Sequence, residues 1–290
     1  MKETRYYAVA GHVFSVAAEA EHFALMQNYE PFGCDGGEAV FALTVGNGDA
    51  PEYTEELRQD DDGQVIICGS RMTNPSERTG EAVFEFRWLG ETAGWLVCSA
   101  DYREVRLVTT GKDTRLAIDN ALMVMYALAT AVKGTVLFHA AIVSFEGRGY
   151  MFLGPSGTGK STHARLWLRY VAGTALVNDD NPVVRIGDDG QTVVYGSPWS
   201  GKTPCYRNVS HPLGAIVVLS QAPYNRIQRL GGIQAYASLV GSISGKRWDE
   251  RIADGLHATE NALASDVPVW HLECLPDEEA ARLCNETITR

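Results

Sequence analysis

The chain has 290 residues, of which 45% are hydrophobic and 21% charged, a composition typical of a globular protein with a full core. Lysine and arginine number 25 against 36 aspartate and glutamate residues, so the net charge is −11. That charge argues against binding to a nucleic-acid backbone or to an anionic membrane, because both need a basic surface.

The first part of the chain consists of short β-type runs separated by turn sequences, and nothing in it has a catalytic pattern. We expect the acidic stretch Glu52–Asp62 to be a solvated loop. These features predict a β-rich α+β domain over residues 1–112. The expected strands are Tyr6–Ala10, Ala39–Val45, Gln64–Cys68, Ala82–Trp88, Trp95–Ser99 and Val105–Thr109.

The most apolar region of the chain is Ala121–Phe145. Lys133, Gly134 and His139 interrupt it, so a buried helix over Thr114–Val132 followed by a buried strand over Thr135–Phe145 explains it better than a membrane span. The N-terminus has no signal-type apolar core, and the six cysteines have no metal-ligand spacing. We therefore expect a cytoplasmic protein with reduced thiols, whose second domain covers residues 113–290.

The second domain alternates strands and helices, which indicates an α/β fold. Strands are expected at Thr135–Phe145, Gly149–Leu153, Thr174–Val177, Val183–Ile186, Thr192–Tyr195, Ala215–Leu219 and Val267–Leu272. Helices are expected at Lys160–Val171, Gln234–Val240, Asp249–Ala264 and Asp277–Cys284.

The strongest motif is GPSGTGKS, which satisfies G-x-x-x-x-G-K-[ST] between an apolar strand and a helix. Such a loop binds phosphate, because its backbone N–H groups and the helix N-terminus point at the anion. Lys160 is expected to reach the β- and γ-phosphates, and the Ser161 hydroxyl to ligate Mg²⁺. The alternative is a chance glycine-rich turn. The predicted nucleotide-binding residues are Gly154, Pro155, Ser156, Gly157, Thr158, Gly159, Lys160, Ser161 and Thr162.

An acidic pair, Asp179-Asp180, follows 19 residues after Lys160 at the predicted end of the next strand. Two carboxylates beside a phosphate site offer a Mg²⁺ ligand and a general base for an attacking hydroxyl. Asn-Asp-Asp-Asn-Pro is also ordinary turn chemistry, which is the alternative interpretation.

Two further side chains are candidate catalytic groups. His139 is placed where a strand end could meet the aspartates, and its alternative is a hydrogen-bonded core histidine. Lys202, in the loop Ser197–Lys202, could present a cation to the transferred phosphoryl group. Three arginines are weaker candidates for phosphate contacts, with surface positions as the alternative: Arg207, Arg226 and Arg229.

Together, His139-Ala140-Ala141, the GPSGTGKS loop and Asn178-Asp179-Asp180 resemble the HPr kinase/phosphorylase family. Its fold is shared with the ATP-dependent phosphoenolpyruvate carboxykinases, and the resemblance covers roughly residues 135–275. It implies that Asp179 is the base, that Asp180 and Ser161 ligate the metal, and that His139 is the family's histidine. Oligomer formation is implied too. The segment Ser197–Lys202 replaces the Glu-Ile-Arg-Gly-Leu-Gly of the HPr kinases, so the acceptor is not fixed to HPr.

These features predict an ATP- and Mg²⁺-dependent phosphotransferase that transfers the γ-phosphoryl group to an acceptor hydroxyl. The acceptor partner would be a serine of a small protein or peptide, or a small molecule. Two other classes stay open. One is an ATPase or nucleotide-dependent switch, in which water replaces the acceptor, and the other is a binding protein that has lost turnover.

Overall fold

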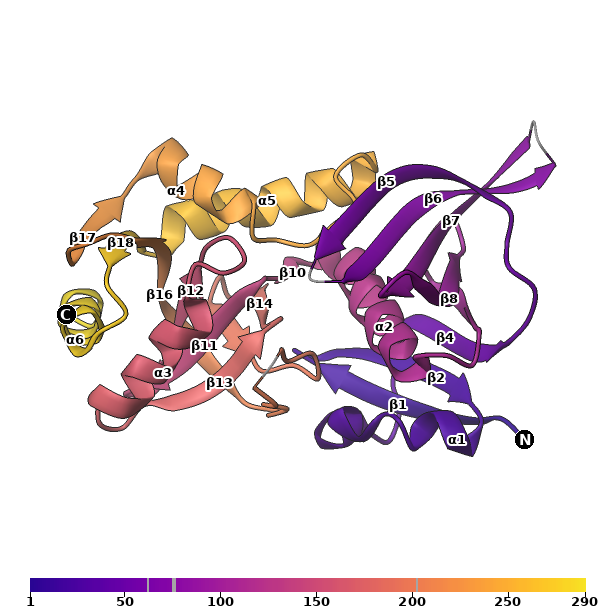
Figure 1. The fold of residues 1–290 in the computed structure, drawn as a ribbon, viewed down its shortest axis with the longest axis horizontal. Helices are drawn as coiled ribbons and strands as arrows, with labels where there is room; N and C mark the ends of the chain where they lie inside the picture. Colours follow the sequence, from indigo (N-terminus) through magenta and orange to yellow (C-terminus); the bar gives the residue numbers. More distant parts are fainter. Residues whose placement is uncertain (62, 75–76, 202) are drawn as a thin grey trace. The chain divides into compact units, whose positions relative to one another are not determined.

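The computed structural model describes residues 1–61, 63–74, 77–201 and 203–290, and in them the chain forms two compact units, Met1–Ala129 and Thr130–Arg290 (Figure 1). The sequence predicted a boundary after residue 112, whereas the contacts divide the chain after Ala129. The reason is that α2 (Thr114–Thr130) packs within the first unit. Its Tyr126 hydroxyl donates a hydrogen bond to the Val9 carbonyl at 2.9 Å.

In the described residues of the first unit, nine strands form one sheet. The pairs β2–β4 and β4–β9 are parallel and the others antiparallel. The β-rich character predicted for this part of the chain is confirmed. In sheet order the strands are β3 (Gly33–Cys34), β1 (Glu3–Val9), β2 (His12–Ala18), β4 (Ala39–Asn47), β9 (Glu104–Thr109), β8 (Glu91–Cys98), β7 (Glu77–Trp88), β6 (Gln64–Asn74) and β5 (Tyr53–Asp61). Two short helices follow β2, namely α1 (Ala20–Phe23) and η1 (Gln27–Phe32).

Besides the short elements α1, η1 and β3, which were not predicted, two strands of this unit differ from the sequence prediction. The acidic stretch expected to be a loop forms β5, which lies at the end of the sheet and, among the residues that the structure describes, pairs with β6 alone. Charged side chains are common on such edge strands, because one side of the strand faces solvent. The strand β2 was not predicted. Its run HVFSVAA is apolar on both faces, so it has no period-two alternation to mark it.

The helix α2, continued by η2 (Ala131–Lys133), is the apolar helix expected before the strand that begins at Thr135. Among the residues that the structure describes, one helix has the length and the apolar composition needed to cross a membrane, and it covers Thr114–Lys133. Of the most apolar stretch of this helix, 61% is buried inside the protein, as is usual for a core helix.

In the described residues of the second unit, nine strands form a mixed sheet. The pairs β12–β16 and β16–β18 are parallel, and the others are antiparallel. The main path is β10 (Thr135–Leu137), β14 (Val183–Ile186), β15 (Thr192–Tyr195), β16 (Ser210–Gln221), β12 (Arg148–Leu153), β11 (Ala140–Phe145) and β13 (Ala175–Asp180). From β16 the sheet branches to β18 (Val269–Cys274) and then to β17 (Arg226–Leu230).

Helices cover this sheet, so the second unit is α/β as predicted. One core cluster joins α3 (Lys160–Tyr170) and α6 (Glu278–Ile288) to one face of the sheet, with the fully buried Trp167 at its centre. Trp167 contacts the rings of Tyr150 and Phe152 at centroid distances of 5.5 and 5.6 Å. Figure 1 shows α4 (Gly232–Val240) and α5 (Glu250–Asp266) side by side, apart from α3 and α6.

Two features of this sheet also differ from the prediction. The strand expected over Thr135–Phe145 is divided, because β10 pairs with β14 whereas β11 lies between β12 and β13. Residues 138 and 139 make the transition between the two strands. The strand β17 was missed, since its exposed Arg226, Gln228 and Arg229 give it the composition of a loop.

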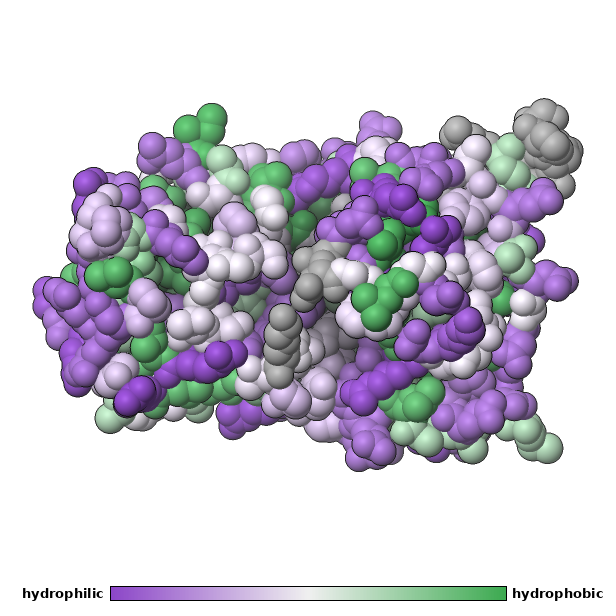
Figure 2. Space-filling model, in the orientation of Figure 1, coloured by the Kyte–Doolittle hydropathy of each residue, from purple (hydrophilic) through white to green (hydrophobic). Residues whose placement is uncertain are grey.

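Hydrophilic and hydrophobic residues are intermixed on the face of the molecule that Figure 2 shows. Green atoms protrude over α4, the helix that contains Ile233, which is 82% exposed. Single exposed apolar side chains are ordinary on a protein surface and do not by themselves mark an interface.

Candidate functional site

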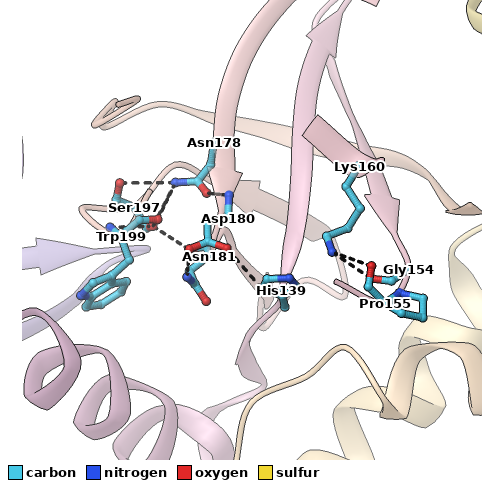
Figure 3. Close-up of polar contacts among 9 residues, drawn as sticks. All are labelled: His139, Gly154, Pro155, Lys160, Asn178, Asp180, Asn181, Ser197 and Trp199. Atoms are coloured by element: carbon cyan, nitrogen blue, oxygen red, sulfur yellow. Dashed lines mark hydrogen bonds and ion pairs between the residues drawn. The ribbon is translucent and has the colours of Figure 1, made fainter. Parts of the chain in front are cut away.

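Three segments that are distant in sequence end at one edge of the second sheet. The strand β11 runs antiparallel to both of its neighbours, and Ala141 pairs with Phe152 on β12 and with Asp179 on β13. Residues just before β11 and residues at the ends of β12 and β13 therefore meet at the same edge. The register thus brings His139, the loop after Leu153 and the acidic pair to the same edge, and Figure 3 shows His139, the loop residues Gly154 and Pro155, and Asp180 there.

The glycine-rich loop, residues 154–159, connects β12 to α3 as the sequence predicted. Its glycines have positive φ angles of 149°, 78° and 108° at Gly154, Gly157 and Gly159, a conformation that L side chains rarely adopt. The helix α3 begins at Lys160, and its N-cap Gly159 provides no side chain to satisfy the first N–H groups. Unpaired N–H groups at a helix N-terminus are a general site for anions.

The side chain of Lys160 turns back onto this loop. It is 8% exposed, and its Nζ donates hydrogen bonds to the carbonyl oxygens of Gly154 at 2.9 Å and Pro155 at 3.3 Å (Figure 3). The ammonium group is thereby held over the loop backbone. A phosphate group bound in the loop would offer this cation oxygen acceptors that carry a full charge.

The remainder of the loop is held by short-range hydrogen bonds and by one contact from β16. The Thr158 N–H and hydroxyl both donate to the Pro155 carbonyl, at 3.2 and 2.7 Å. Gln221 Nε2, at the end of β16, donates to the Gly157 carbonyl at 3.3 Å. No sequence signal indicated Gln221. Ser161 is half-buried, and Ser156 and Thr162 are exposed.

Asp180 and His139 are in polar contact at the sheet edge. His139 Nδ1 lies 3.2 Å from Asp180 Oδ1, and Asn181 Nδ2 donates to the other carboxylate oxygen at 2.8 Å. Both side chains are partly exposed, at 41% for His139 and 32% for Asp180. The structure therefore brings His139 and Asp180 together, and His139 is not a fully buried core histidine.

Asp179 has a different environment from its neighbour. It is 5% exposed, and within the part of the chain that the structure describes its Oδ1 atom has no hydrogen-bond partner. Because adjacent residues of a strand point to opposite faces, Asp179 shares the face of Ala141 and α3, whereas Asp180 faces the other way. A buried carboxylate oxygen without a partner is costly unless it has a ligand to bind.

Asn178 fixes the backbone of the acidic pair. It is fully buried, its Oδ1 accepts from the Asp180 N–H at 3.0 Å, and its Nδ2 donates to Ser197 Oγ and to the Trp199 carbonyl, both at 3.1 Å (Figure 3). Ser197 Oγ in turn donates to the Asn181 carbonyl at 2.6 Å. Sequence analysis assigned no role to Asn178, although its place before the aspartates was the available signal.

The described part of the predicted loop, Ser197–Gly201, therefore lies beside the acidic pair. The Gly201 N–H donates to the Asp179 carbonyl at 3.1 Å, and a Cβ atom at Gly201 would lie only 2.9 Å from that oxygen. This close approach requires glycine. Lys202 is outside the described residues. Of the arginines proposed as phosphate contacts, Arg207 donates to the Leu176 carbonyl at 2.7 Å, and Arg226 and Arg229 lie on β17.

Oxygen donors suited to Mg²⁺ are present at this edge, namely the carboxylates of Asp179 and Asp180 and the Ser161 hydroxyl. The unpartnered Oδ1 of Asp179 is able to accept either a proton or a cation. In residues 1–61, 63–74, 77–201 and 203–290, no group of three or more His, Cys, Asp or Glu side chains could hold a metal. In nucleotide sites, phosphate oxygens and water usually complete the coordination of a Mg²⁺ ion that has one or two protein ligands.

The fold and the site define a mixed α/β protein in which a glycine-rich strand–loop–helix element and an acidic pair share one sheet edge. The chain belongs to the ScmC family, because the model of the SynChlorMet cassette protein ScmC matches residues 104–274, more than half of the sequence. No curated protein matches the chain.

One solved structure that is similar to this chain is that of the Hpr(Ser) kinase/phosphatase from Coxiella burnetii. The two chains are 13% identical with a TM-score of 0.31, and the match covers 53% of this chain and 88% of the other.

Proposed function

We propose that residues 130–290 bind ATP with Mg²⁺ and transfer the γ-phosphoryl group to an acceptor hydroxyl. The observation that supports this proposal best is the shared sheet edge, where the Lys160 loop, His139 and the acidic pair meet. Phosphoryl transfer needs little more than positioned phosphates, positive charge and an oriented nucleophile, and each of these has a candidate group at this edge.

Each side chain has a separate task in this proposal. The loop N–H groups and Lys160 bind the phosphates, and Lys160 stabilises the charge that develops on them. Asp179, buried on the α3 face, takes the proton from the acceptor hydroxyl. Asp180 and Ser161 would hold Mg²⁺, which supplies positive charge to the phosphates when bound, and His139 orients the Asp180 carboxylate.

A calorimetric titration with MgATP tests the binding step. We expect Lys160→Met to weaken binding at least tenfold, because it removes the loop's cation without adding bulk, whereas the exposed Lys133→Met is the matched control and binds as the wild type. Equal affinity of the wild type and the Lys160 variant would refute a nucleotide site at this loop.

Steady-state kinetics of two variants distinguish the roles proposed for Asp179 and Asp180. Asp179→Asn should bind MgATP normally and lose at least about a hundredfold in kcat, the size expected for a general base. Asp180→Asn should raise the Mg²⁺ concentration needed for half-maximal rate. Reversed phenotypes would exchange the two roles.

Phosphate release measured without any acceptor distinguishes the alternative class. A kinase should release inorganic phosphate slowly until a hydroxyl-bearing acceptor is added. Rapid release in the absence of an acceptor would favour an ATPase or nucleotide-dependent switch.

A further inference from the structure

The backbone of His139 is held by a segment from a distant part of the chain, Ser242–Ser244. The His139 N–H donates to the Ser242 carbonyl at 2.7 Å, and the Ser244 N–H donates to the Leu137 carbonyl at 3.0 Å. Phe138 and Ile243 form a β-bridge between these two hydrogen bonds. The turn that presents His139 to Asp180 is thus fixed by this segment and does not depend on β10 and β11 alone.

One guanidinium group holds the segment in place. Arg247 Nη2 donates to the carbonyl oxygens of Val240 at 2.8 Å and Ile243 at 3.4 Å, and to Glu260 Oε1 at 2.7 Å. Val240 ends α4 and Glu260 belongs to α5. Arg247 therefore ties the end of one helix and the segment that holds His139 to a second helix.

Glu260, the carboxylate that Arg247 contacts, is itself held by its surroundings. Its side chain is fully buried, and its other oxygen accepts from the Tyr236 hydroxyl at 3.3 Å. The Tyr236 oxygen also lies 2.5 Å from His257 Nδ1. Separating a buried carboxylate from its arginine partner is costly, because it leaves an uncompensated charge in the interior. The pair therefore stays together in the folded protein.

We propose that Arg247 and Glu260 are positioning residues for the reaction at the sheet edge. They fix the Ser242–Ser244 segment and, through it, the backbone of His139, so that the imidazole meets the Asp180 carboxylate. This inference rests on the proposed phosphoryl transfer for its catalytic consequence. Its structural part, the coupling of Glu260 to the His139 backbone, stands without it.

Amide hydrogen exchange and steady-state kinetics on the full chain test the coupling. In Glu260→Gln and Arg247→Lys we expect the His139 and Ser244 amides to exchange at least about tenfold faster, while the amides of β12 stay protected. We expect kcat for the MgATP reaction to fall about tenfold, with KM for ATP changed by less than about twofold, because the nucleotide loop is untouched.

The chain contains a matched control pair. Arg282 and Glu278 on α6 form an ion pair of the same 2.7 Å length, but they are 54% and 49% exposed. Glu278→Gln and Arg282→Lys should leave both amides and both kinetic constants unchanged. If Glu260→Gln does not fold, Tyr236→Phe removes one hydrogen bond to Glu260 and should give a smaller rise at the same amides.

Three outcomes would overturn the inference. If the His139 and Ser244 amides of the folded Glu260→Gln and Arg247→Lys variants exchange as slowly as in the wild type, Glu260 is not coupled to the His139 backbone. A rise in KM for ATP with unchanged kcat would assign Arg247 to nucleotide binding. Faster exchange with unchanged kcat would leave Arg247 and Glu260 with a purely structural role. If the wild type binds no ATP and transfers no phosphate, the proposed function fails, and the exchange result still decides the coupling.

Discussion

His163 is a buried histidine on α3, the helix that follows the glycine-rich loop. It follows Lys160 by three positions on α3 and is 3% exposed, with its ring 4.8 Å from that of Phe152. Burial lowers the pKa of His163 from 6.5 to about 4. Trp167 Nε1 donates to its Nε2 at 3.1 Å, so the neutral ring carries its proton on Nδ1.

This shift makes the stability of the second unit depend on pH. The unfolded chain protonates His163 near pH 6.5, whereas the folded chain resists protonation until about pH 4, so folding loses stability as the pH falls between these values. Linkage gives a loss of about 2 kcal/mol at pH 5 and about 3 kcal/mol at pH 4, relative to neutral pH.

The variant His163→Gln isolates this contribution. Glutamine accepts a hydrogen bond from Trp167 but has no charge to gain, so the variant lacks the His163 titration while all the other groups titrate as before. Urea unfolding of both proteins at pH 7.5 and pH 5.0 gives the comparison. We expect the wild type to lose about 2 kcal/mol more than the variant over this interval.

A direct measurement accompanies the unfolding curves. Parallel curves for the wild type and His163→Gln would refute the reasoning. A His163 pKa above 6 in the folded protein, measured by NMR, would refute it as well.

Three further predictions concern hydrogen bonds seen in the fold. Asn178→Ala should cost about 3 kcal/mol of unfolding free energy in urea, because it leaves several buried groups without partners. Asp277→Ala should cost about 1 kcal/mol in the same assay, since Asp277 caps α6 through the Ala280 N–H at 2.9 Å. Burial alone would raise the pKa of Glu85, but hydrogen bonds led by Arg87 outweigh it and lower the pKa. Glu85→Gln should therefore lower the free energy of unfolding at pH 7. The difference in unfolding free energy between the wild type and this variant should become smaller as the pH falls below about 4.5.

Local sequence patterns were enough to find most of the second unit. The helix α3 starts at Lys160 as expected, because a glycine-rich loop after an apolar strand ends the strand and leaves a helix N-terminus. The strands β14 and β15 have their predicted bounds, since Asp188-Asp189-Gly190 is typical of a hairpin turn. In these elements the cause of the structure lies within a few residues of the chain.

The errors arose where pairing over long distances decides the structure. Nothing within Thr135–Phe145 indicates that its two halves belong to different neighbours, because β10 pairs with β14 and β11 with β12. The exposed edge strands β5 and β17 resemble loops in composition, and only their partners show them to be strands. Strand propensity depends on the neighbouring strand, so a single sequence cannot supply it.

The candidate site shows both situations at once. The motif at Lys160 and the acidic pair were visible in the sequence, whereas the contact between His139 and Asp180 depends on the register of β11 against β13. The same register separates the two aspartates, because Asp179 faces α3 with an unpartnered oxygen and Asp180 faces the histidine. Neighbouring residues on a strand cannot occupy one environment. A site built on such a pair therefore places its two carboxylates in different environments, one buried with an unpartnered oxygen and the other beside His139.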